Sequence, residues 1–375
     1  MEPEGRKRIL IVDDSAVMRS LLRTVIARDA ALEVAGTAAD GASALGLMDV
    51  LRPDLVLLDV EMPVMDGLST LKGMRERGHP MPVVMCSALT QRGARVTIEA
   101  LANGAADYVT KPGSQESREA AVETLARELL PKLRALTGGG TTLPGAMQTR
   151  RGAEEMPMVT RTPMPVARPA VVVIGVSTGG PAALEVLLPA LPASFPLPVL
   201  VVQHMPELFT QTLAERLDGR CRLRVREARE GDLVRAGMVH LARGNWHLEM
   251  RTGPRPGEPV FLHLTQAPME NHCRPAVDVL LRSAVGVFGG GVLAVQLTGM
   301  GSDGLAGCRA VRAQGGTVLA QDEMTSAVWG MPGAVAHAGL AHRVLPIQAM
   351  ASEILRLTRQ VGNEARELQE TAVRG

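Results

Sequence analysis

The sequence predicts an α/β protein with two doubly wound domains, and two observations support this fold class. Short apolar runs alternate with helical patterns in residues 8–136 and again from residue 170 to about 360, which is typical of parallel sheets covered by helices. The chain has 375 residues, more than a single hydrophobic core usually serves. We expect a first domain at 1–136, a linker at 137–168, a larger and mostly parallel second domain at 169–365 and a tail at 366–375.

The first domain is predicted to contain five parallel strands, because five short apolar runs are spaced through it between helical segments. They are Ile9–Val12, Glu33–Gly36, Leu55–Leu58, Pro82–Met85 and Tyr108–Thr110. Ligands of such sheets bind outside the carboxyl ends of the strands. The residues that follow each run are therefore the first candidates for a functional site.

Charged and hydroxyl side chains follow four of these runs, namely Asp13, Asp14, Asp59, Ser87 and Lys111. Three carboxylates at one edge of a sheet repel each other unless a cation lies among them, and oxygen ligands favour Mg²⁺. A carboxylate beside Mg²⁺ and a lysine can accept a phosphoryl group. The alternative is that these aspartates only cap helices.

Together these residues resemble the receiver domains of response regulators. The resemblance covers residues 8 to about 134 and includes Asp13-Asp14, Asp59, Met62-Pro63-x-x-Asp66-Gly67, Ser87 and Tyr108-x-x-Lys111-Pro112. It implies that Asp59 is the phosphoryl acceptor and that Mg²⁺ is held by Asp13, Asp14, Asp59 and the carbonyl of Glu61. It also implies a switch formed by Ser87 and Tyr108 together with Lys111. Serine at position 87 replaces the more common threonine but keeps the hydroxyl, so we expect signalling to be unaffected.

Residues 137–168 lack apolar periodicity and are predicted to be a tether, partly flexible and partly extended. Three consecutive glycines, Gly138 to Gly140, are followed by four prolines. The segment carries four arginines and two glutamates but is short of aromatic residues, which is unlike a nucleic-acid-binding arm.

The second domain opens with an apolar run from Val171 that leads into Gly175-x-Ser177-x-Gly179, followed by Pro181. This spacing is that of a nucleophile elbow, a turn so tight that glycines flank one exposed serine hydroxyl. Proline then favours the first turn of a helix. Two alternatives are a loop that cradles a dinucleotide phosphate and a turn that only packs a helix on a strand. The spacing Gly175-x-x-x-Gly179-Gly180 differs from G-x-G-x-x-G, which weakens the dinucleotide alternative.

A histidine and an aspartate follow two further apolar runs. His204 comes after the strand predicted at Val199–Val202, and Asp303 comes after the one predicted at Val292–Leu297. With Ser177, they would supply a nucleophile, a general base and a carboxylate that fixes the imidazole tautomer, as a serine hydrolase requires. Taken singly, His204 could be an ordinary residue at a strand end and Asp303 a turn residue.

The composition excludes several classes of protein. Lys+Arg 40 against Asp+Glu 39 gives a net charge of +1, so we expect no nucleic-acid partner and no binding to an anionic membrane. The four cysteines form no C-x-x-C pair, which favours reduced thiols over a disulfide or zinc framework. The apolar run near the N-terminus is too short for a signal peptide, so we expect a cytoplasmic protein. The uncharged stretch Ser283–Ser302 contains six glycines, and we expect a buried strand between glycine turns, with no membrane insertion.

Across both domains, the chain resembles the chemotaxis protein-glutamate methylesterase family, CheB type. The motifs that carry this resemblance are Leu89-Thr90-Gln91-Arg92-Gly93, Ile174-Gly175-Val176-Ser177-Thr178-Gly179-Gly180, Val202-Gln203-His204-Met205-Pro206, Arg274-Pro275-Ala276-Val277-Asp278-Val279-Leu280, Leu297-Thr298-Gly299-Met300-Gly301-Ser302-Asp303-Gly304 and Gln321-Asp322-Glu323.

The resemblance implies a phosphorylation-controlled hydrolase of glutamyl methyl esters on the cytoplasmic helices of methyl-accepting chemoreceptors. It would release methanol, deamidate particular receptor glutamines and receive its phosphoryl group from a chemotaxis histidine kinase, with no cofactor for ester hydrolysis. By position, Ser177 is the nucleophile, His204 the base and Asp303 its orienting carboxylate, with Thr178 and Met300 at the oxyanion site. Ser302 stands where many members have asparagine, so we assign its side chain no role.

The residues leave two other functions open: a response regulator whose second domain only binds a partner, and a phospho-gated peptidase or general esterase. Both predicted sites lie at the carboxyl edge of a sheet, where a neighbouring domain could cover them. In the family, the unphosphorylated receiver packs against the catalytic domain and hinders access to the triad. We expect the same occlusion here.

Overall fold

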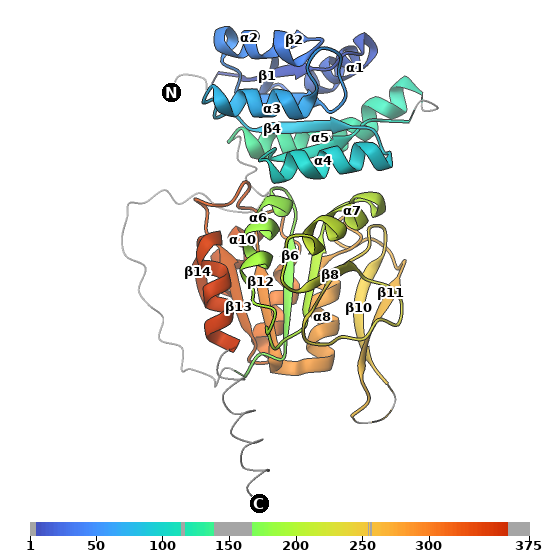
Figure 1. The fold of residues 1–375 in the computed structure, drawn as a ribbon, viewed down its shortest axis with the longest axis vertical. Helices are drawn as coiled ribbons and strands as arrows, with labels where there is room; N and C mark the ends of the chain where they lie inside the picture. Colours follow the sequence, from blue (N-terminus) through green and yellow to red (C-terminus); the bar gives the residue numbers. More distant parts are fainter. Residues whose placement is uncertain (1–4, 114–116, 139–166, 254, 256, 359–375) are drawn as a thin grey trace, which may run out of the picture.

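The structure, a computed structural model, describes residues 5–113, 117–138, 167–253, 255 and 257–358. Most of the expected linker and the whole expected tail at 366–375 lie outside the described residues. The described residues form two α/β domains, which are drawn one above the other in Figure 1. The expected fold class is confirmed.

The N-terminal domain is a five-stranded parallel sheet with strand order β2-β1-β3-β4-β5. All five predicted strands are present, and β2 is longer than expected. The strands are β1 (Lys7–Val12), β2 (Leu32–Ala38), β3 (Leu55–Asp59), β4 (Val83–Ser87) and β5 (Asp107–Thr110). The helices are α1 (Ala16–Ile26), α2 (Gly41–Leu51), α3 (Gly67–Glu76), α4 (Gln91–Ala102) and α5 (Arg118–Leu136).

Each of these five helices begins at a polar side chain that accepts a hydrogen bond from the backbone N–H three residues later. The five N-caps are Ser15, Asp40, Asp66, Thr90 and Ser117. Asp13, Asp14 and Asp59 are not among them. The alternative in which those aspartates serve only as helix caps is therefore wrong.

The C-terminal domain is built on a seven-stranded parallel sheet with order β14-β13-β12-β6-β7-β9-β8. Its strands are β6 (Val171–Val176), β7 (Val199–Gln203), β8 (Arg224–Glu227), β9 (Met238–Leu241), β12 (Val292–Gln296), β13 (Thr317–Gln321) and β14 (Arg343–Leu345). Its helices include α6 (Gly180–Leu187), α7 (Glu207–Asp218), α8 (Val277–Phe288), α9 (Leu305–Ala313) and α10 (Met331–His337), with short 3₁₀ turns η1 (Leu188–Ala190) and η2 (Gly289–Gly291).

Two features of this domain differ from the sequence prediction or extend it. An antiparallel hairpin of β10 (His247–Thr252) and β11 (Val260–Thr265) stands beside the main sheet. The uncharged stretch 283–302 contains the expected buried strand, β12, but its first residues form the end of α8. Within the described part of the chain, no helix is both long and apolar enough to cross a membrane.

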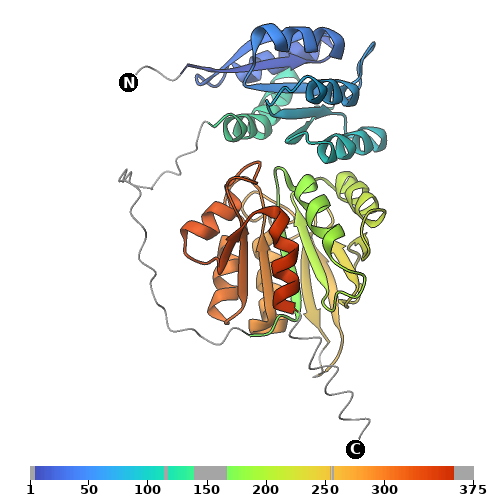
Figure 2. The same cartoon turned by 60° about the vertical axis from the view of Figure 1, so that its left-hand side comes forward.

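The two domains touch through α4 of the first and α6 and α7 of the second (Figures 1 and 2). The rings of Tyr108 and Phe209 stack across the contact, with centroids 4.6 Å apart. Thr178 Oγ1 donates a hydrogen bond to Asp107 Oδ2 at 2.5 Å, and Gly179 N–H donates to the Ala106 carbonyl at 3.1 Å. The contact therefore involves the two residues that follow Ser177.

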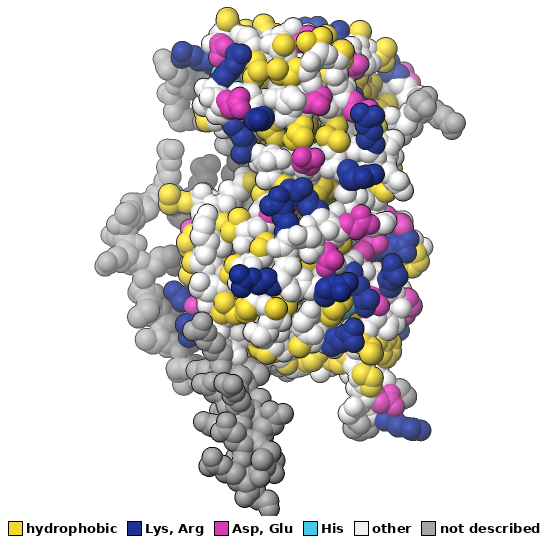
Figure 3. Space-filling model, viewed as in Figure 1, with side chains coloured by type: hydrophobic (Ala, Val, Ile, Leu, Met, Phe, Trp, Pro, Cys, Tyr) yellow, Lys and Arg dark blue, Asp and Glu magenta, His cyan; other side chains and the backbone are white. Residues whose placement is uncertain are grey.

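The face shown in Figure 3 carries basic and acidic side chains mixed over both domains. Neither sign of charge dominates that face, in keeping with the net charge of +1.

Candidate active site

Ser177 lies directly after β6, in the turn that leads into α6. Every residue of β6 is buried, as its apolar sequence predicts. The turn closes through Gly179, whose φ of +77° is a left-handed conformation that favours glycine. A side chain at Gly179 would also place its Cβ 2.5 Å from the Cβ of Ala327. The predicted strand, turn and helix around Ser177 are thus present.

His204 lies next to Ser177 because of the register of the sheet. Val176, the last residue of β6, pairs with Gln203, the last residue of β7. Ser177 directly follows the first of these residues and His204 directly follows the second. The Gln203 side chain braces the turn, since its Nε2 donates a hydrogen bond to the Ser177 carbonyl at 3.0 Å. The two predicted side chains are therefore presented at the same edge of the sheet.

Asp303 lies 2.8 Å from His204, measured from Oδ2 to Nε2. The first residues of α8 also donate to this carboxylate, from Val277 N–H at 2.7 Å and Asp278 N–H at 3.1 Å. Asn271 Nδ2 donates to Oδ1 at 2.9 Å. Burial by itself would raise the pKa of Asp303, but His204 and the backbone donors outweigh it and lower the pKa. Asp303 is therefore held as an oriented anion at a helix N-terminus.

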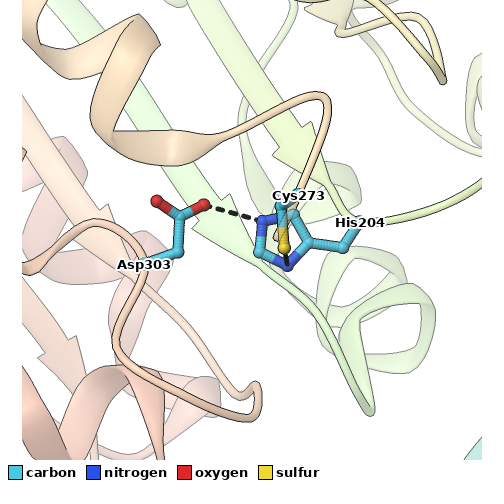
Figure 4. A group of neighbouring side chains, drawn as sticks. All are labelled: His204, Cys273 and Asp303. Carbon is cyan, nitrogen blue, oxygen red and sulfur yellow. Dashed lines mark hydrogen bonds and ion pairs between the residues drawn. The ribbon is translucent and has the colours of Figure 1, made fainter. Parts of the chain in front are cut away.

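The imidazole of His204 contacts a second side chain, the thiol of Cys273. The sulfur lies 3.6 Å from Nδ1. Burial would lower the pKa of His204, but the interactions with Asp303 and Cys273 raise it to about 9. Figure 4 shows the sulfur and the carboxylate approaching the ring from different sides.

Cys273 is the hydrogen-bond partner of Nδ1, the ring nitrogen that faces away from Asp303. One donor atom from each of His204, Cys273 and Asp303 lies within 4.8 Å of the other two. Although both residues are described, the structure shows no hydrogen bond between Ser177 Oγ and His204.

The two predicted oxyanion residues flank Ser177. Thr178 is buried and its hydroxyl is bonded to Asp107. Met300 is half-buried in the loop after β12. That loop packs tightly on the elbow, because a Cβ at Gly299 would lie 2.8 Å from the Cβ of Ser177.

A second cluster lies at the carboxyl edge of the N-terminal sheet. The carboxylates of Asp13, Asp14 and Asp59 offer oxygens within 4.8 Å of one another. Lys111 Nζ is 2.8 Å from Asp13 Oδ2 and 2.7 Å from Asp59 Oδ2. Burial, assisted by the charge of Asp13, raises the pKa of Asp59 to about 6 despite Lys111. Crowded carboxylates of this kind fit a hard divalent cation such as Mg²⁺.

The remaining residues predicted for this cluster occupy different positions. The backbone N–H of Glu61 lies 3.4 Å from Asp59 Oδ1, whereas its exposed side chain pairs with Arg92. Ser87 is buried at the end of β4. Tyr108 is buried and stacks on Phe209, so it connects this domain to the other one.

Sequence reasoning missed Asn271 and Cys273, which both lie on the loop before α8. Neither follows an apolar strand, so the search at strand ends could not find them. The signal available was their position just before the motif that begins at Arg274.

Comparisons with known proteins show which family the chain resembles along both domains. A family model described as CheB methylesterase matches residues 172–354, and one described as response regulator receiver domain matches residues 9–123. A protein-glutamate methylesterase/protein-glutamine glutaminase from Trichodesmium erythraeum is 45% identical over 355 residues, which cover 93% of this chain and 98% of the relative. A protein of the same description from Nocardioides sp. is 48% identical over 356 residues, covering 94% and 96%. The crystal structure of the Thermotoga maritima CheB methylesterase catalytic domain has a TM-score of 0.49 and 42% identity, covering 51% of this chain and 100% of that one.

Proposed function

Because the chain belongs to the chemotaxis protein-glutamate methylesterase family with an N-terminal receiver domain, we propose that it hydrolyses glutamyl methyl esters on the cytoplasmic domains of chemoreceptors and deamidates specific receptor glutamines. The proposal includes control by phosphorylation of Asp59, a histidine kinase as phosphoryl donor and action in the cytoplasm, for sensory adaptation. The observation that carries it is the 2.8 Å contact between His204 and Asp303 beside the Ser177 turn.

The proposed reaction begins when Ser177 Oγ attacks the ester carbonyl. Its proton passes to Nδ1 of the neutral His204 imidazole, the ring nitrogen that faces away from Asp303; because the pKa of His204 is raised to about 9, this neutral form becomes more populated as the pH rises toward 9. The same proton then goes to the leaving methoxide, so methanol departs and an acyl enzyme remains. Water, deprotonated by His204, cleaves the acyl enzyme and restores Ser177 with a free glutamate. For a glutamine substrate the leaving group is ammonia.

Asp303 and the two loops around Ser177 would support this chemistry. Asp303 holds the proton on Nε2 and stabilises the imidazolium that forms. The backbone N–H groups of Thr178 and Met300 are proposed to receive the negative charge that develops on the carbonyl oxygen. Apo enzymes often show a loose contact between nucleophile and base, so the missing hydrogen bond between Ser177 and His204 is compatible with this role.

The receiver cluster is proposed to make Asp59 the phosphoryl acceptor. Asp13, Asp14, Asp59 and the carbonyl of Glu61 would hold Mg²⁺, which neutralises the incoming charge when bound. Lys111 already lies 2.7 Å from Asp59 and would clamp the phosphoryl oxygens.

The contact between the domains supports occlusion of the active site in the unphosphorylated chain. Thr178, a proposed oxyanion residue, is bonded through its hydroxyl to Asp107 of the receiver. The receiver docks with α4 and the first residues of β5, whereas Asp59 lies at the opposite, carboxyl edge of its sheet. Phosphorylation must therefore act through the switch residues. Movement of Ser87 toward the phosphoryl group would let Tyr108 follow and leave Phe209.

The catalytic proposal is tested by methanol release from methylated receptor with the phosphorylated full-length chain. Ser177→Ala should abolish release and labelling by a serine-directed organophosphonate, while its thermal unfolding stays close to that of the wild type. Ser194, an exposed serine in the same domain, supplies the control Ser194→Ala, which should behave like the wild type. Normal turnover in Ser177→Ala would exclude the elbow as the catalytic site. Absence of turnover and labelling in the wild type would favour a domain that only binds a partner.

The receiver proposal is tested by a small phosphodonor with Mg²⁺, followed by borohydride trapping and peptide mapping. We expect the label at Asp59 and its loss in Asp59→Ala. A label that persists in Asp59→Ala would move the acceptor to another residue.

A further inference from the structure

The fold gathers a thiol, an imidazole and a carboxylate that lie far apart in the sequence. His204 follows β7, Cys273 lies on the loop before α8, and Asp303 lies on the loop after β12. One donor atom of each lies within 4.8 Å of the other two. The spacing of cysteines along the chain could not reveal this set, because a C-x-x-C search examines only close neighbours.

From this cluster we infer that the proposed active site also binds a ligand through His204, Cys273 and Asp303, namely one soft divalent cation of the Zn²⁺ type. Zn²⁺ binds sulfur at about 2.3 Å and nitrogen or oxygen at about 2.0–2.2 Å, so its tetrahedral ligand atoms lie about 3.3–3.6 Å apart. Here Nε2 of His204 and Oδ2 of Asp303 are 2.8 Å apart, and the sulfur is 3.6 Å from Nδ1, the other nitrogen of the same ring. Movement of the Cys273 side chain from Nδ1 toward Nε2 would give the ion three ligands from donor atoms that now lie within 4.8 Å of one another, and water would take the fourth position.

The chemistry of the donors separates this site from the receiver cluster. Asp13, Asp14 and Asp59 offer only oxygen, which suits Mg²⁺, whereas a thiolate with an imidazole selects a softer ion. One thiolate and one carboxylate also balance the charge of a divalent ion. That balance matters because the Asp303 carboxylate is buried and an unpaired charge there would be costly.

The surroundings hold the three ligands in place without any ion. Asn271 Nδ2 bonds to Asp303 at 2.9 Å and to Asp278 at 3.0 Å. The loop of Cys273 is fixed by paired backbone hydrogen bonds between Cys273 and Glu270, at 2.8 and 3.1 Å. Such supporting contacts strengthen metal sites. His204 and Cys273 are only partly buried, so an ion can reach them from solvent.

Binding of the ion at this site would stop the proposed ester hydrolysis. This inhibition rests on the proposed function, whereas the binding of the ion is independent of it. The Cys273 thiol would lose its proton to solvent. The ion would take Nε2 of His204, and the proton now shared with Asp303 would move to Nδ1. An imidazole protonated at Nδ1 cannot accept the Ser177 proton, so hydrolysis would stop while the ion is bound. Removal of the ion by a chelator would restore activity.

The test uses Co²⁺ as a spectroscopic stand-in for Zn²⁺, added to the full-length chain with excess Mg²⁺ to fill the receiver site. We expect a thiolate-to-cobalt charge-transfer band that Zn²⁺ abolishes. In Cys273→Ala the band should be absent, and the affinity for Zn²⁺ should fall by at least about tenfold. Cys221→Ala removes another partly exposed thiol of the same domain and should match the wild type. For each variant, the rate of methanol release with Zn²⁺ is compared with the rate of the same variant without metal.

The outcomes separate this inference from the catalytic proposal. Ser177→Ala should lose turnover but keep the cobalt band, since Ser177 is not among the three ligands. A band without turnover in the wild type would uphold the metal site and defeat the catalytic proposal. Turnover in the wild type without a band that depends on Cys273 would overturn the metal site.

Discussion

Asp303 is the residue on which the arrangement of the proposed active site depends. It joins three segments, because its carboxylate contacts His204 after β7, Asn271 on the loop before α8 and the first backbone N–H groups of α8. These contacts fix the ring of His204 so that Nε2 faces the carboxylate and Nδ1 faces away from it. The proposed base therefore acts through one defined ring nitrogen.

Replacing Asp303 by asparagine should lower kcat by roughly 10³ to 10⁴, because an amide favours the wrong imidazole tautomer. The amide also presents an NH₂ group to at least one backbone donor, so we expect some loss of stability. Methanol release and thermal unfolding should be measured on the same sample. A kcat within a factor of about ten of the wild type, in a folded variant, would remove Asp303 from the proposed triad.

At the scale of single residues, the sequence predicts those that follow strands and misses those on irregular loops. Ser177, His204 and Asp303 each come after a buried strand, so parallel pairing brings them to one edge. Cys273 has no such signal, and its position depends on the path of the loop before α8. Its contact with His204 becomes visible only in three dimensions.

At the scale of elements, α7 and β5 couple the domains through one aromatic pair. Tyr108 of β5 stacks on Phe209 of α7 with an angle of 14° between the ring planes. Lys132 of α5 supports this end of β5, since its Nζ lies 3.1 Å from Asp107 Oδ1 and 2.6 Å from the Tyr108 carbonyl. Helix α5 therefore holds in place the end of β5 that contacts the second domain.

Phe209→Leu should raise the unphosphorylated rate about two- to tenfold, because an aromatic pair contributes about 0.5–1.5 kcal/mol beyond buried area. The rate of the phosphorylated chain should change little. Phe195→Leu is the matched control, since Phe195 is equally buried in the same domain and no ring contact joins it to Tyr108. Equal effects of the two substitutions would indicate general loosening of the domain.

Helix α5 also anchors the far side of the receiver through Arg134, whose Nε lies 2.5 Å from Asp29 Oδ2 after α1. The hydrogen bond from Arg134 lowers the pKa of Asp29, although burial opposes the shift. A lowered folded-state pKa stabilises the fold above the unfolded pKa of about 3.9, and this stability is lost as the pH falls through the lower folded value. Arg134 is about half exposed, so we expect about 1 kcal/mol or less.

Asp29→Asn tests this ion pair in chemical unfolding at several pH values. The difference in unfolding free energy from the wild type should be constant between pH 5 and 7 and should shrink below about pH 4. A difference that stays the same in acid would show that Asp29 contributes by packing instead of by charge.

The elements that the sequence predicts well are those with continuous apolar runs. β6, β7 and β12 are buried along their whole length, and the five receiver strands also coincide with apolar runs of the sequence. The polar edge strand β8 and the hairpin of β10 and β11 lack such runs, because they are partly exposed. For the uncharged stretch from Ser283, the sequence predicts a buried strand between glycine turns and does not indicate that α8 continues to Phe288, because both buried helices and buried strands can be uncharged.

At the scale of the whole molecule, the two halves lie in a closed arrangement that covers the residues after Ser177. The contact combines one hydrogen bond to Thr178, one to Gly179 and one ring stack. A bias of about 1.4 kcal/mol changes the ratio of open to closed forms tenfold, so an interface of modest strength is enough for control. Asp59 lies at the opposite edge of the receiver sheet from Asp107, so the proposed control by phosphorylation would have to be relayed through the receiver.

The measurement that tests this account most directly is methanol release from methylated receptor by three forms of the protein. They are the unphosphorylated full-length chain, the phosphorylated full-length chain and the fragment 169–375. The account predicts that the unphosphorylated chain is slowest and that both other forms are well above it. A fragment no faster than the unphosphorylated full-length chain would contradict occlusion and would point to a receiver that recruits the enzyme to its substrate.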